Sequence, residues 1–195
     1  EASQLVASLV SIPEGGRFLD VCASPGGKTS LIALKNRSAA IVAGDIYHPR
    51  VEFLRSNCLR QGILSVQVAQ YDAAESLPFA DSSFDAVLVD APCSGTGTIG
   101  SNPEIRYFLS PEDIAELSRK QLTILLNASK LVKSGGRLYY ATCSMEREEN
   151  EDVIAAFLAE SKDFDATLID TEPRFITADG FGRTLPDRDG TDGFF

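Results

Sequence analysis

Two cysteines stand where nucleophilic chemistry could take place, Cys93 within VDAPCSGTG and Cys143 within YATCS. Each follows an apolar run that is typical of a buried strand. A cysteine thiolate is a strong nucleophile that forms covalent intermediates with its substrates. Two thiols at the ends of neighbouring strands can divide such work, because one attacks the substrate while the other assists proton removal or product release.

Short apolar runs alternate with amphipathic stretches along the chain. The sequence predicts strands over residues 17–21, 40–46, 66–72, 84–92 and 136–144, and helices over residues 28–36, 49–62 and 148–160. Alternation of this kind indicates βαβ units around a parallel sheet. We therefore expect an α/β fold, with a Rossmann-like, doubly wound and mostly parallel sheet.

A longer helix is predicted before the last strand. Ser110 can cap it, with Pro111 at the first helical position and Asp113 three residues after the cap. An apolar stripe at helical spacing continues to the stop signal KSGG at residues 133–136. Residues 171–195 are rich in Gly, Pro and Asp, so we expect loops and turns that end at the start of an apolar strand.

The composition suits one catalytic domain over residues 1–195, since 44% of the residues are hydrophobic. Four cysteines are too few for a disulfide framework, and none has the C-x-x-C spacing of a zinc site. We expect reduced thiols, no bound metal and a cytoplasmic location.

No apolar run approaches the roughly 18 residues that span a bilayer. The start EASQLVASLV lacks an initiator Met, so we expect the chain to begin inside a longer protein.

The net charge of −10 argues against a protein that binds nucleic acid through its own basic surface. The charge is unevenly distributed, because residues 146–195 hold 14 acidic and 5 basic side chains while residues 1–145 hold 14 and 13. The acidity thus belongs mainly to the last quarter of the chain. There the run EREENED, residues 146–152, predicts a solvated helix start whose acids suit the helix dipole.

The segment FLDVCASPGGKTS predicts a strand, a glycine turn and a helix, a geometry that presents backbone N–H groups to a ligand. Residues 27–29 also match the end of a phosphate loop, and Asp90 could then hold magnesium. A P-loop NTPase is therefore an alternative. Against it, Cys22 stands where the first glycine of that motif belongs, and Pro25 stiffens the loop.

Four acids, Asp20, Asp45, Asp72 and Asp90, lie at the predicted carboxyl ends of strands. Any one alone is explained as a turn residue. Together with the glycine loop they favour a ligand at that edge of the sheet, where Asp45 can accept hydrogen bonds from both ribose hydroxyls and Asp72 from an adenine amino group. We expect an adenosine cofactor without a triphosphate. S-adenosylmethionine fits, because its sulfonium needs no phosphate cradle.

A methyl donor explains the thiols if the methyl acceptor is C5 of a pyrimidine, which is a poor nucleophile. A thiolate that adds to C6 makes C5 part of an enamine, and C5 then attacks the methyl group. Loss of the C5 proton expels the thiol, which requires a base. Asp90, three residues before Cys93, could hold the N3/N4 edge of the base.

The motifs DVCASPGGKT, DAPCSGTG and ATCS resemble the cofactor loop and the two cysteine motifs of the Sun/RsmB-type family of RNA 5-methylcytosine methyltransferases. The pairing of Pro-Cys with Thr-Cys is the specific part. The likeness covers the whole chain and includes the runs NPEIRYFLSPEDI, EREENEDVI and DGTDGFF. It implies the class I fold of S-adenosylmethionine-dependent methyltransferases, and RNA, in particular small-subunit ribosomal RNA, as the substrate.

The resemblance also implies roles for individual residues. By position, Cys143 is the nucleophile that attacks C6, Cys93 assists proton removal or product release, and Asp90 reaches towards the target cytosine. The implied cofactor site comprises Cys22, Ala23, Ser24, Pro25, Gly26, Gly27, Lys28, Asp45, Arg50, Asp72 and Asp90. Bacterial RsmB-type proteins carry an N-terminal RNA-binding region, which we expect to lie outside this chain and to supply much of the basic surface.

Two other classes stay open. A module that binds cofactor and RNA without turnover is one, although such a module needs neither thiol. An exocyclic amino methyltransferase is another, but it uses an Asp-Pro-Pro-aromatic motif where this chain has Ala91-Pro92-Cys93 after Asp90. The single histidine, His48, is expected to be structural or exposed, which weakens any mechanism that requires a histidine base.

Overall fold

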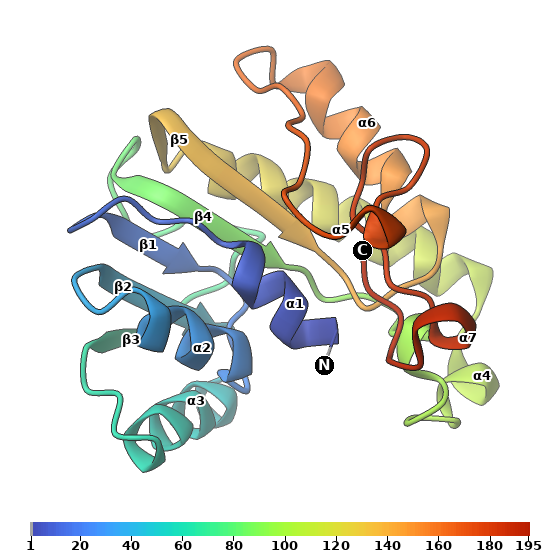
Figure 1. Ribbon diagram of the computed structural model, residues 1–195, viewed down its shortest axis with the longest axis horizontal. Helices are drawn as coiled ribbons and strands as arrows, with labels where there is room; N and C mark the ends of the chain where they lie inside the picture. The colour runs from blue at the N-terminus through green and yellow to red at the C-terminus, as the bar shows by residue number, and fades with distance from the viewer. Residues whose placement is uncertain (1) are drawn as a thin grey trace. The chain divides into compact units, whose positions relative to one another are not determined.

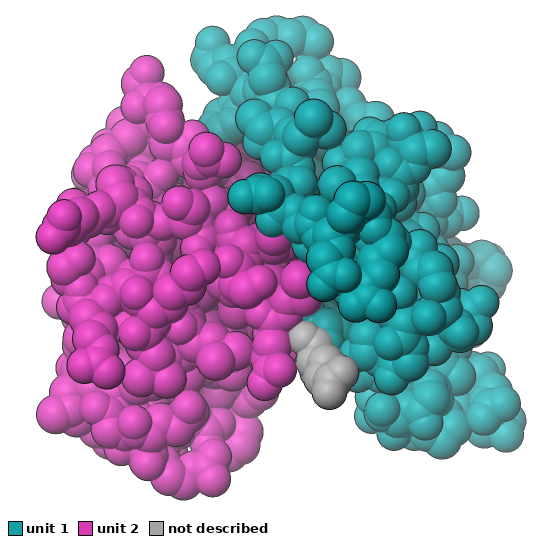
Figure 2. Space-filling model, in the orientation of Figure 1, with its two compact units in different colours: residues 1–2, 91–123, 141–195 teal, residues 3–90, 124–140 magenta. Residues whose placement is uncertain are grey.

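The computed structural model describes residues 2–195, which form two compact units (Figure 2). We call Ser3–Asp90 with Ile124–Tyr140 the sheet unit. We call Ala91–Thr123 with Ala141–Phe195, to which Ala2 is attached, the thiol unit. The predicted cofactor residues belong to the sheet unit, and both Cys93 and Cys143 belong to the thiol unit.

A five-stranded sheet in the order β3-β2-β1-β4-β5 forms the sheet unit (Figure 1). The strands are β1 (Arg17–Asp20), β2 (Ala40–Asp45), β3 (Val66–Gln70), β4 (Phe84–Asp90) and β5 (Val132–Ala141). β1 pairs in parallel with β2 and with β4, and β2 pairs in parallel with β3. The arrow of β5 points the same way as that of β4 in Figure 1. The predicted doubly wound, mostly parallel sheet is confirmed.

The central strands are buried along most of their length. Phe18 and Leu19 of β1 are fully buried, and so are residues 86–89 of β4. Continuous apolar runs of this kind are typical of parallel strands that are covered on both faces. At the edge, β3 is only partly buried. The burial therefore follows the position of each strand in the sheet.

Three helices contribute to one apolar cluster of the sheet unit. They are α1 (Ala2–Leu9), α2 (Gly27–Lys35) and α3 (His48–Arg60). Ala7 of α1, Ile32 of α2 and Leu54 of α3 join the same cluster as Phe18 and Leu88 of the sheet. The helices α2 and α3 were predicted from periodicity. α1 was not, because two turns give too short a pattern to recognise.

The long helix α5 (Pro111–Ser129) starts as predicted. Asp113 Oδ2 accepts from the Ser110 backbone N–H at 2.8 Å, and the Asp113 N–H donates to Ser110 Oγ at 3.3 Å, which is a reciprocal cap. The helix ends before the predicted stop signal KSGG at residues 133–136, but the strand that follows begins four residues earlier than the predicted residue 136. The helix ends at Ser129, and β5 begins at Val132, so the glycine pair lies inside the strand. Glycines in a strand often mark a bulge or a bend.

The thiol unit contains short elements joined by loops. Besides the first part of α5, they are α4 (Ile105–Phe108), α6 (Glu151–Glu160), α7 (Pro186–Asp189) and the 3-10 turns η1 (Thr96–Thr98), η2 (Arg147–Glu149) and η3 (Pro173–Phe175). The predicted helix over residues 148–160 is confirmed as α6, with η2 before it. Among residues 2–195, no helix has both the length and the apolar character that crossing a membrane requires.

Residues 171–195 consist largely of loops and turns, as predicted. They form two isolated antiparallel bridges, Ile176 with Gly182 and Thr184 with Phe194. The last residue, Phe195, also exchanges both backbone hydrogen bonds with Thr142, at 2.9 and 3.1 Å. The C-terminal segment therefore supports the residue that precedes Cys143.

Candidate functional site

The glycine loop of the sheet unit turns tightly between β1 and α2. The Ala23 N–H donates to the Gly44 carbonyl at 2.8 Å, and the Gly26 N–H donates to the Ala23 carbonyl at 2.7 Å. Gly26 has a φ of 100°, and a Cβ at this position would lie 2.7 Å from Leu54 Cδ1. Glycine is therefore required there. The loop leads directly into the N-terminus of α2, whose first N–H groups can bind a ligand.

Asp45 at the end of β2 is tied to this loop and to α3. Its Oδ2 accepts from the Ser24 N–H at 3.3 Å, while Arg50 donates to the Ser24 carbonyl at 3.2 Å. Arg50 Nε also lies 3.3 Å from Asp45 Oδ1. Asp45 is only 4% exposed, whereas half of the Arg50 side chain is exposed. The carboxylate is thus held in place from two sides.

The surroundings of Asp45 fit the ribose of an adenosine cofactor. Its Oδ1 is buried, and within residues 2–195 it accepts no hydrogen bond, because the contact with Arg50 is an ion pair without hydrogen-bond geometry. A buried carboxylate oxygen with unused acceptor capacity is costly unless a ligand donates to it. Two neighbouring ribose hydroxyls can supply those donors.

Asp20 lies deeper than the other acids. It pairs with Ala43 in β2 and with Leu88 in β4, so it sits two residues, or about 6 to 7 Å, before the row of Asp45 and Asp90. The four acids therefore do not form one row. The Thr29 hydroxyl donates to Asp20 Oδ2 at 2.6 Å, and burial raises the pKa of Asp20 to about 7.

Asp90 and Lys28 form an ion pair at the end of β4. Lys28 Nζ lies 2.6 Å from Asp90 Oδ2, so the expectation that Lys28 reaches a carboxylate is confirmed. Burial raises the pKa of Asp90, and the Lys28 charge partly opposes that rise. Asp72 follows the end of β3 by two residues, and its Oδ1 accepts from the Ala74 N–H at 2.9 Å. One Asp72 oxygen thus serves a turn, and its role towards adenine stays a prediction.

The remaining cysteines and the histidine belong to the sheet unit. Cys58 is 3% exposed on α3, and His48 is exposed at the first residue of that helix, as expected. Cys22 lies in the glycine loop, where burial raises the pKa of its thiol. Cys22 and Cys58 are therefore poor candidates for a thiolate nucleophile.

The thiol unit brings the two predicted catalytic cysteines into contact. Cys93 Sγ and Cys143 Sγ lie 3.3 Å apart, although 50 residues separate them in the sequence. Both thiols are partly exposed. The contact with Cys143 and burial raise the pKa of Cys93. Two thiols this close lose their protons one at a time, because a second thiolate would face the first.

Backbone hydrogen bonds and one buried amide hold the loop around Cys143. The Cys143 carbonyl accepts from the Gly97 N–H at 2.9 Å, and a Cβ on Gly97 would collide with the Gly193 carbonyl. The Asn150 amide donates to the Ser144 carbonyl at 2.9 Å and accepts from the Thr142 hydroxyl at 2.6 Å. Both residues that flank Cys143 are thus tied to the same buried side chain.

Sequence reasoning missed the importance of Glu149 and Asn150. The prediction that residues 146–152 form a solvated helix start is wrong for these two, because both are fully buried. An acidic run gives no periodic signal that distinguishes one buried carboxylate from its exposed neighbours. The closeness of the run to Cys143 in the sequence was the only available indication.

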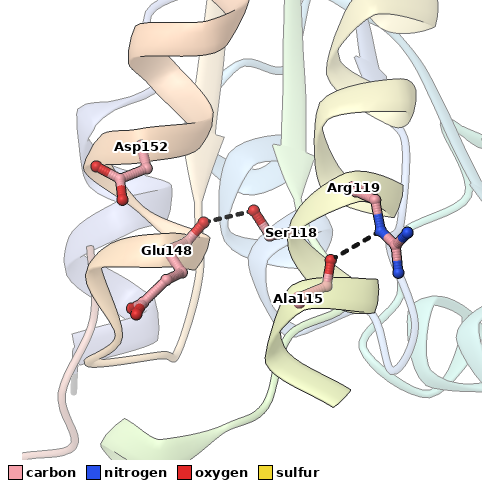
Figure 3. Close-up of a pocket in the computed structure, with 5 residues that line it drawn as sticks. All are labelled: Ala115, Ser118, Arg119, Glu148 and Asp152. Atoms are coloured by element: carbon pink, nitrogen blue, oxygen red, sulfur yellow. Dashed lines mark hydrogen bonds between the residues drawn. The ribbon is translucent and has the colours of Figure 1, made fainter. Parts of the chain in front are cut away.

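A shallow pocket of about 480 Å³ lies elsewhere on the thiol unit, between α5 and the start of α6 (Figure 3). Its lining comprises Ala115, Ser118, Arg119, Glu148 and Asp152. The Ser118 hydroxyl donates to the Glu148 carbonyl at 2.6 Å, and Arg119 Nε donates to the Ala115 carbonyl of its own helix at 3.1 Å. None of the predicted site residues lines it, so we do not assign it to the candidate site.

Comparison with known proteins identifies relatives along nearly the whole chain. A family model described as 16S rRNA methyltransferase RsmB/F matches residues 7–195. A probable ribosomal RNA small subunit methyltransferase B from Bacillus subtilis is 38% identical over 202 residues, which cover 100% of this chain and 45% of the relative. The ribosomal RNA small subunit methyltransferase B of Thermus thermophilus is 36% identical, with 100% and 47% covered. The chain thus spans less than half the length of these relatives.

A solved structure agrees with the sequence matches. The crystal structure of NSun6 from Pyrococcus horikoshii with SFG, an analogue of S-adenosylmethionine, superimposes with a TM-score of 0.84 at 28% identity. The match covers 99% of this chain and 50% of that chain. The fold of the chain is therefore that of S-adenosylmethionine-dependent methyltransferases.

Proposed function

Because the chain belongs to the RsmB/F family of 16S rRNA methyltransferases, we propose that it transfers the methyl group of S-adenosylmethionine to C5 of a cytosine in small-subunit ribosomal RNA. The observation that best supports this proposal is the 3.3 Å contact between Cys93 Sγ and Cys143 Sγ. Methylation of an amino group or a hydroxyl needs no thiol, whereas methylation of a pyrimidine carbon needs a nucleophile at C6.

In the proposed reaction, the Cys143 thiolate forms a bond to C6, and the electrons of the C5–C6 double bond move towards C4 and N3. The bound cofactor supplies an electrophilic methyl group on a sulfonium sulfur. C5 takes that methyl group while the sulfonium keeps the electrons of the broken bond. A base then removes the C5 proton, the double bond re-forms, and Cys143 leaves as a thiolate.

Cys93 is suited to the second half of this reaction. Its pKa is raised largely by the neighbouring Cys143 sulfur. Once Cys143 is bonded to C6 it is a neutral thioether, so that interaction no longer disfavours a Cys93 thiolate. Cys93 can then accept the C5 proton or assist the departure of Cys143.

The cofactor side of the proposal rests on the sheet unit. We assign the ribose hydroxyls to Asp45, whose Oδ1 has unused acceptor capacity, and the methionine part to the loop over residues 22–28. Asp72 is assigned to the adenine amino group through its second oxygen. Asp90, held by Lys28, is assigned to the N3/N4 edge of the cytosine.

The chain alone does not supply a strongly basic surface, because residues 1–145 are close to neutral and residues 146–195 are acidic. We therefore assign RNA affinity largely to the part of the longer relatives that precedes the matched region. The target cytosine must leave its stack for Cys143 to reach C6, so a flipped or single-stranded cytosine is required.

Trapping of the covalent intermediate tests the proposal. Small-subunit ribosomal RNA that contains 5-fluorocytosine should remain bonded to the protein in a denaturing gel, because fluorine cannot leave C5 as a proton does. With unmodified RNA, Cys93→Ala should accumulate a covalent adduct between Cys143 and C6 of the methylated cytosine and slow turnover at least about tenfold. Cys143→Ala should form no adduct with either RNA. An adduct that persists in Cys143→Ala would refute the assigned nucleophile.

A second outcome would support a different class. If the wild-type protein binds S-adenosylmethionine and RNA but forms neither an adduct nor 5-methylcytosine, the binding module without turnover becomes the better description. Binding of magnesium ATP in place of S-adenosylmethionine would instead favour the P-loop reading of residues 27–29.

A further inference from the structure

Glu149 of the thiol unit is a fully buried carboxylate with four hydrogen-bond donors around it. Oε1 accepts from the Ser94 backbone N–H at 2.9 Å and from the Gln121 amide at 2.8 Å. Oε2 accepts from the Ser144 hydroxyl at 2.5 Å and from the Ser94 hydroxyl. A carboxylate offers about four acceptor positions, so these donors satisfy both of its oxygens.

The residues bound to Glu149 adjoin both thiols. Ser94 directly follows Cys93, and Ser144 directly follows Cys143. Both serine hydroxyls donate to the same oxygen, Oε2. A single carboxylate oxygen therefore joins the two cysteine loops at the residue after each thiol.

Gln121 of α5 extends this arrangement to the other side of Cys93. Its amide donates to the Pro92 carbonyl at 2.9 Å as well as to Glu149 Oε1. The residues before and after Cys93 are thus both connected to Glu149, one directly and one through Gln121. The loop of Cys93 cannot shift without loss of one of these bonds.

The physical cost of such a shift is large in a buried site. Hydrogen bonds to a charged acceptor are stronger than those between neutral groups, and a buried carboxylate that loses a donor is poorly solvated. The network therefore favours one separation of the two loops over all others. That separation places the two sulfur atoms 3.3 Å apart.

We propose that Glu149 is a positioning residue that sets the distance between the Cys93 and Cys143 thiols through the hydroxyls of Ser94 and Ser144. Its consequence for catalysis rests on the proposed methyl transfer, in which both thiols act on one base. The spacing itself does not depend on that proposal and can be measured without RNA or cofactor.

Phenylarsine oxide measures the spacing, because its arsenic binds two close thiols at once and releases one water molecule without a change of oxidation state. The wild-type chain should bind the arsenical at least about tenfold more tightly than Cys93→Ala, which has one thiol at the site. Glu149→Gln replaces one of the two carboxylate oxygens, either Oε1 or Oε2, by an NH2 group that donates hydrogen bonds and cannot accept them. It should lower the affinity for the arsenical at least about fivefold while the circular dichroism spectrum stays that of a folded protein.

Glu148→Gln is the matched control, because it removes the same charge from an exposed neighbour. Its affinity for the arsenical should equal that of the wild type. If Glu149→Gln fails to fold, Ser94→Ala decides, since it removes one hydroxyl and keeps the backbone bond to Oε1. That variant should weaken arsenical binding about threefold.

Kinetics provide the second measurement. With ribosomal RNA, Glu149→Gln should lower kcat at least about tenfold and leave the KM for S-adenosylmethionine unchanged, since the assigned cofactor residues belong to the sheet unit and Glu149 to the thiol unit. Equal arsenical affinity for wild type and folded Glu149→Gln would overturn the proposal. So would a wild type that binds no better than Cys93→Ala. Failure of methylation alone, with the arsenical results as expected, would count against the proposed function and not against the role of Glu149.

Discussion

In the sheet unit the acids Asp45 and Asp90 stand at the ends of strands that backbone hydrogen bonds hold in register, whereas in the thiol unit the two cysteines stand in loops that buried side chains hold together with a few backbone hydrogen bonds. Asp45 and Asp90 are the last residues of β2 and β4. Cys93 and Cys143 follow strands too, but the buried side chains of Glu149 and Asn150 bind the loops that carry them.

This difference determines how each site should respond to substitution. A parallel ladder keeps the position of a strand end when one side chain changes, so a substitution there should remove one ligand contact and little else. A loop held by a side-chain network moves when one member is lost. One substitution in the cofactor site of the sheet unit should therefore remove one ligand contact. One substitution in the side-chain network of the thiol unit should disturb several contacts at once.

The largest effect should come from Cys143→Ala, which tests whether the two sites can be separated. We expect methyl transfer to fall at least about 10⁴-fold, because the nucleophile is removed. Affinity for S-adenosylmethionine should not change, since the cofactor residues belong to the sheet unit. Calorimetric titration with the cofactor and a methylation assay measure the two quantities. Loss of cofactor binding in this variant would contradict the division.

Asp20→Asn should change the pH dependence of stability. The folded protein retains the Asp20 proton up to about pH 7, whereas the unfolded chain releases it near the ordinary value of 3.8. Unfolding therefore releases a proton between these values, and the free energy of unfolding falls as pH rises through that window. Asp20→Asn should remove this fall, which is on the order of 4 kcal/mol at most.

Urea unfolding at pH 5 and at pH 8 captures about 3 kcal/mol of this fall and can be compared between the two proteins. The exposed Asp81 provides the control, because Asp81→Asn should leave the dependence on pH as in the wild type. If the free energy of unfolding changes equally with pH in the wild type and in Asp20→Asn, Asp20 is already ionised at low pH in the folded protein.

A smaller effect is expected for Asp45→Asn. This substitution tests whether the loss of one cofactor contact leaves the thiol site unchanged. The amide keeps one oxygen acceptor and loses the negative charge, so affinity for S-adenosylmethionine should fall about 10-fold to 100-fold. Affinity for phenylarsine oxide should stay unchanged, and Asp81→Asn should alter neither. A change in the response to the arsenical would show that the two sites are not independent.

The smallest effect should come from Ser110→Ala at the start of α5. The hydroxyl takes part in the reciprocal cap with Asp113, and its loss should lower the free energy of unfolding by about 1 kcal/mol. Thermal unfolding measures this loss. Both ligand affinities should equal those of the wild type under conditions where the variant is folded, since the Ser110 hydroxyl bonds to Asp113 at the start of α5.

Local sequence patterns predicted much of the fold and part of each site. The alternation of apolar runs and amphipathic stretches predicted the five strands, α2, α3, α5 and α6. Acids after apolar runs predicted that Asp20, Asp45 and Asp90 end strands. The stop signal at residues 133–136 correctly indicated that the helix ends but did not indicate that β5 already includes these residues, because a glycine pair disrupts a helix and is tolerated in a strand. The pattern therefore indicated an ending without distinguishing the element that follows.

The order of the elements, the glycine loop and the two thiols after strands could all be predicted from the sequence, because each depends on residues that are neighbours along the chain. Tertiary structure alone decided that Asp20 lies two residues deeper than Asp45 and Asp90, because strand register depends on pairing between distant segments. It also decided that Glu149 is buried among donors from residues 94, 121 and 144. Such a carboxylate looks like its exposed neighbours until folding brings those donors to it, and the 3.3 Å spacing of the thiols depends on the same long-range contacts.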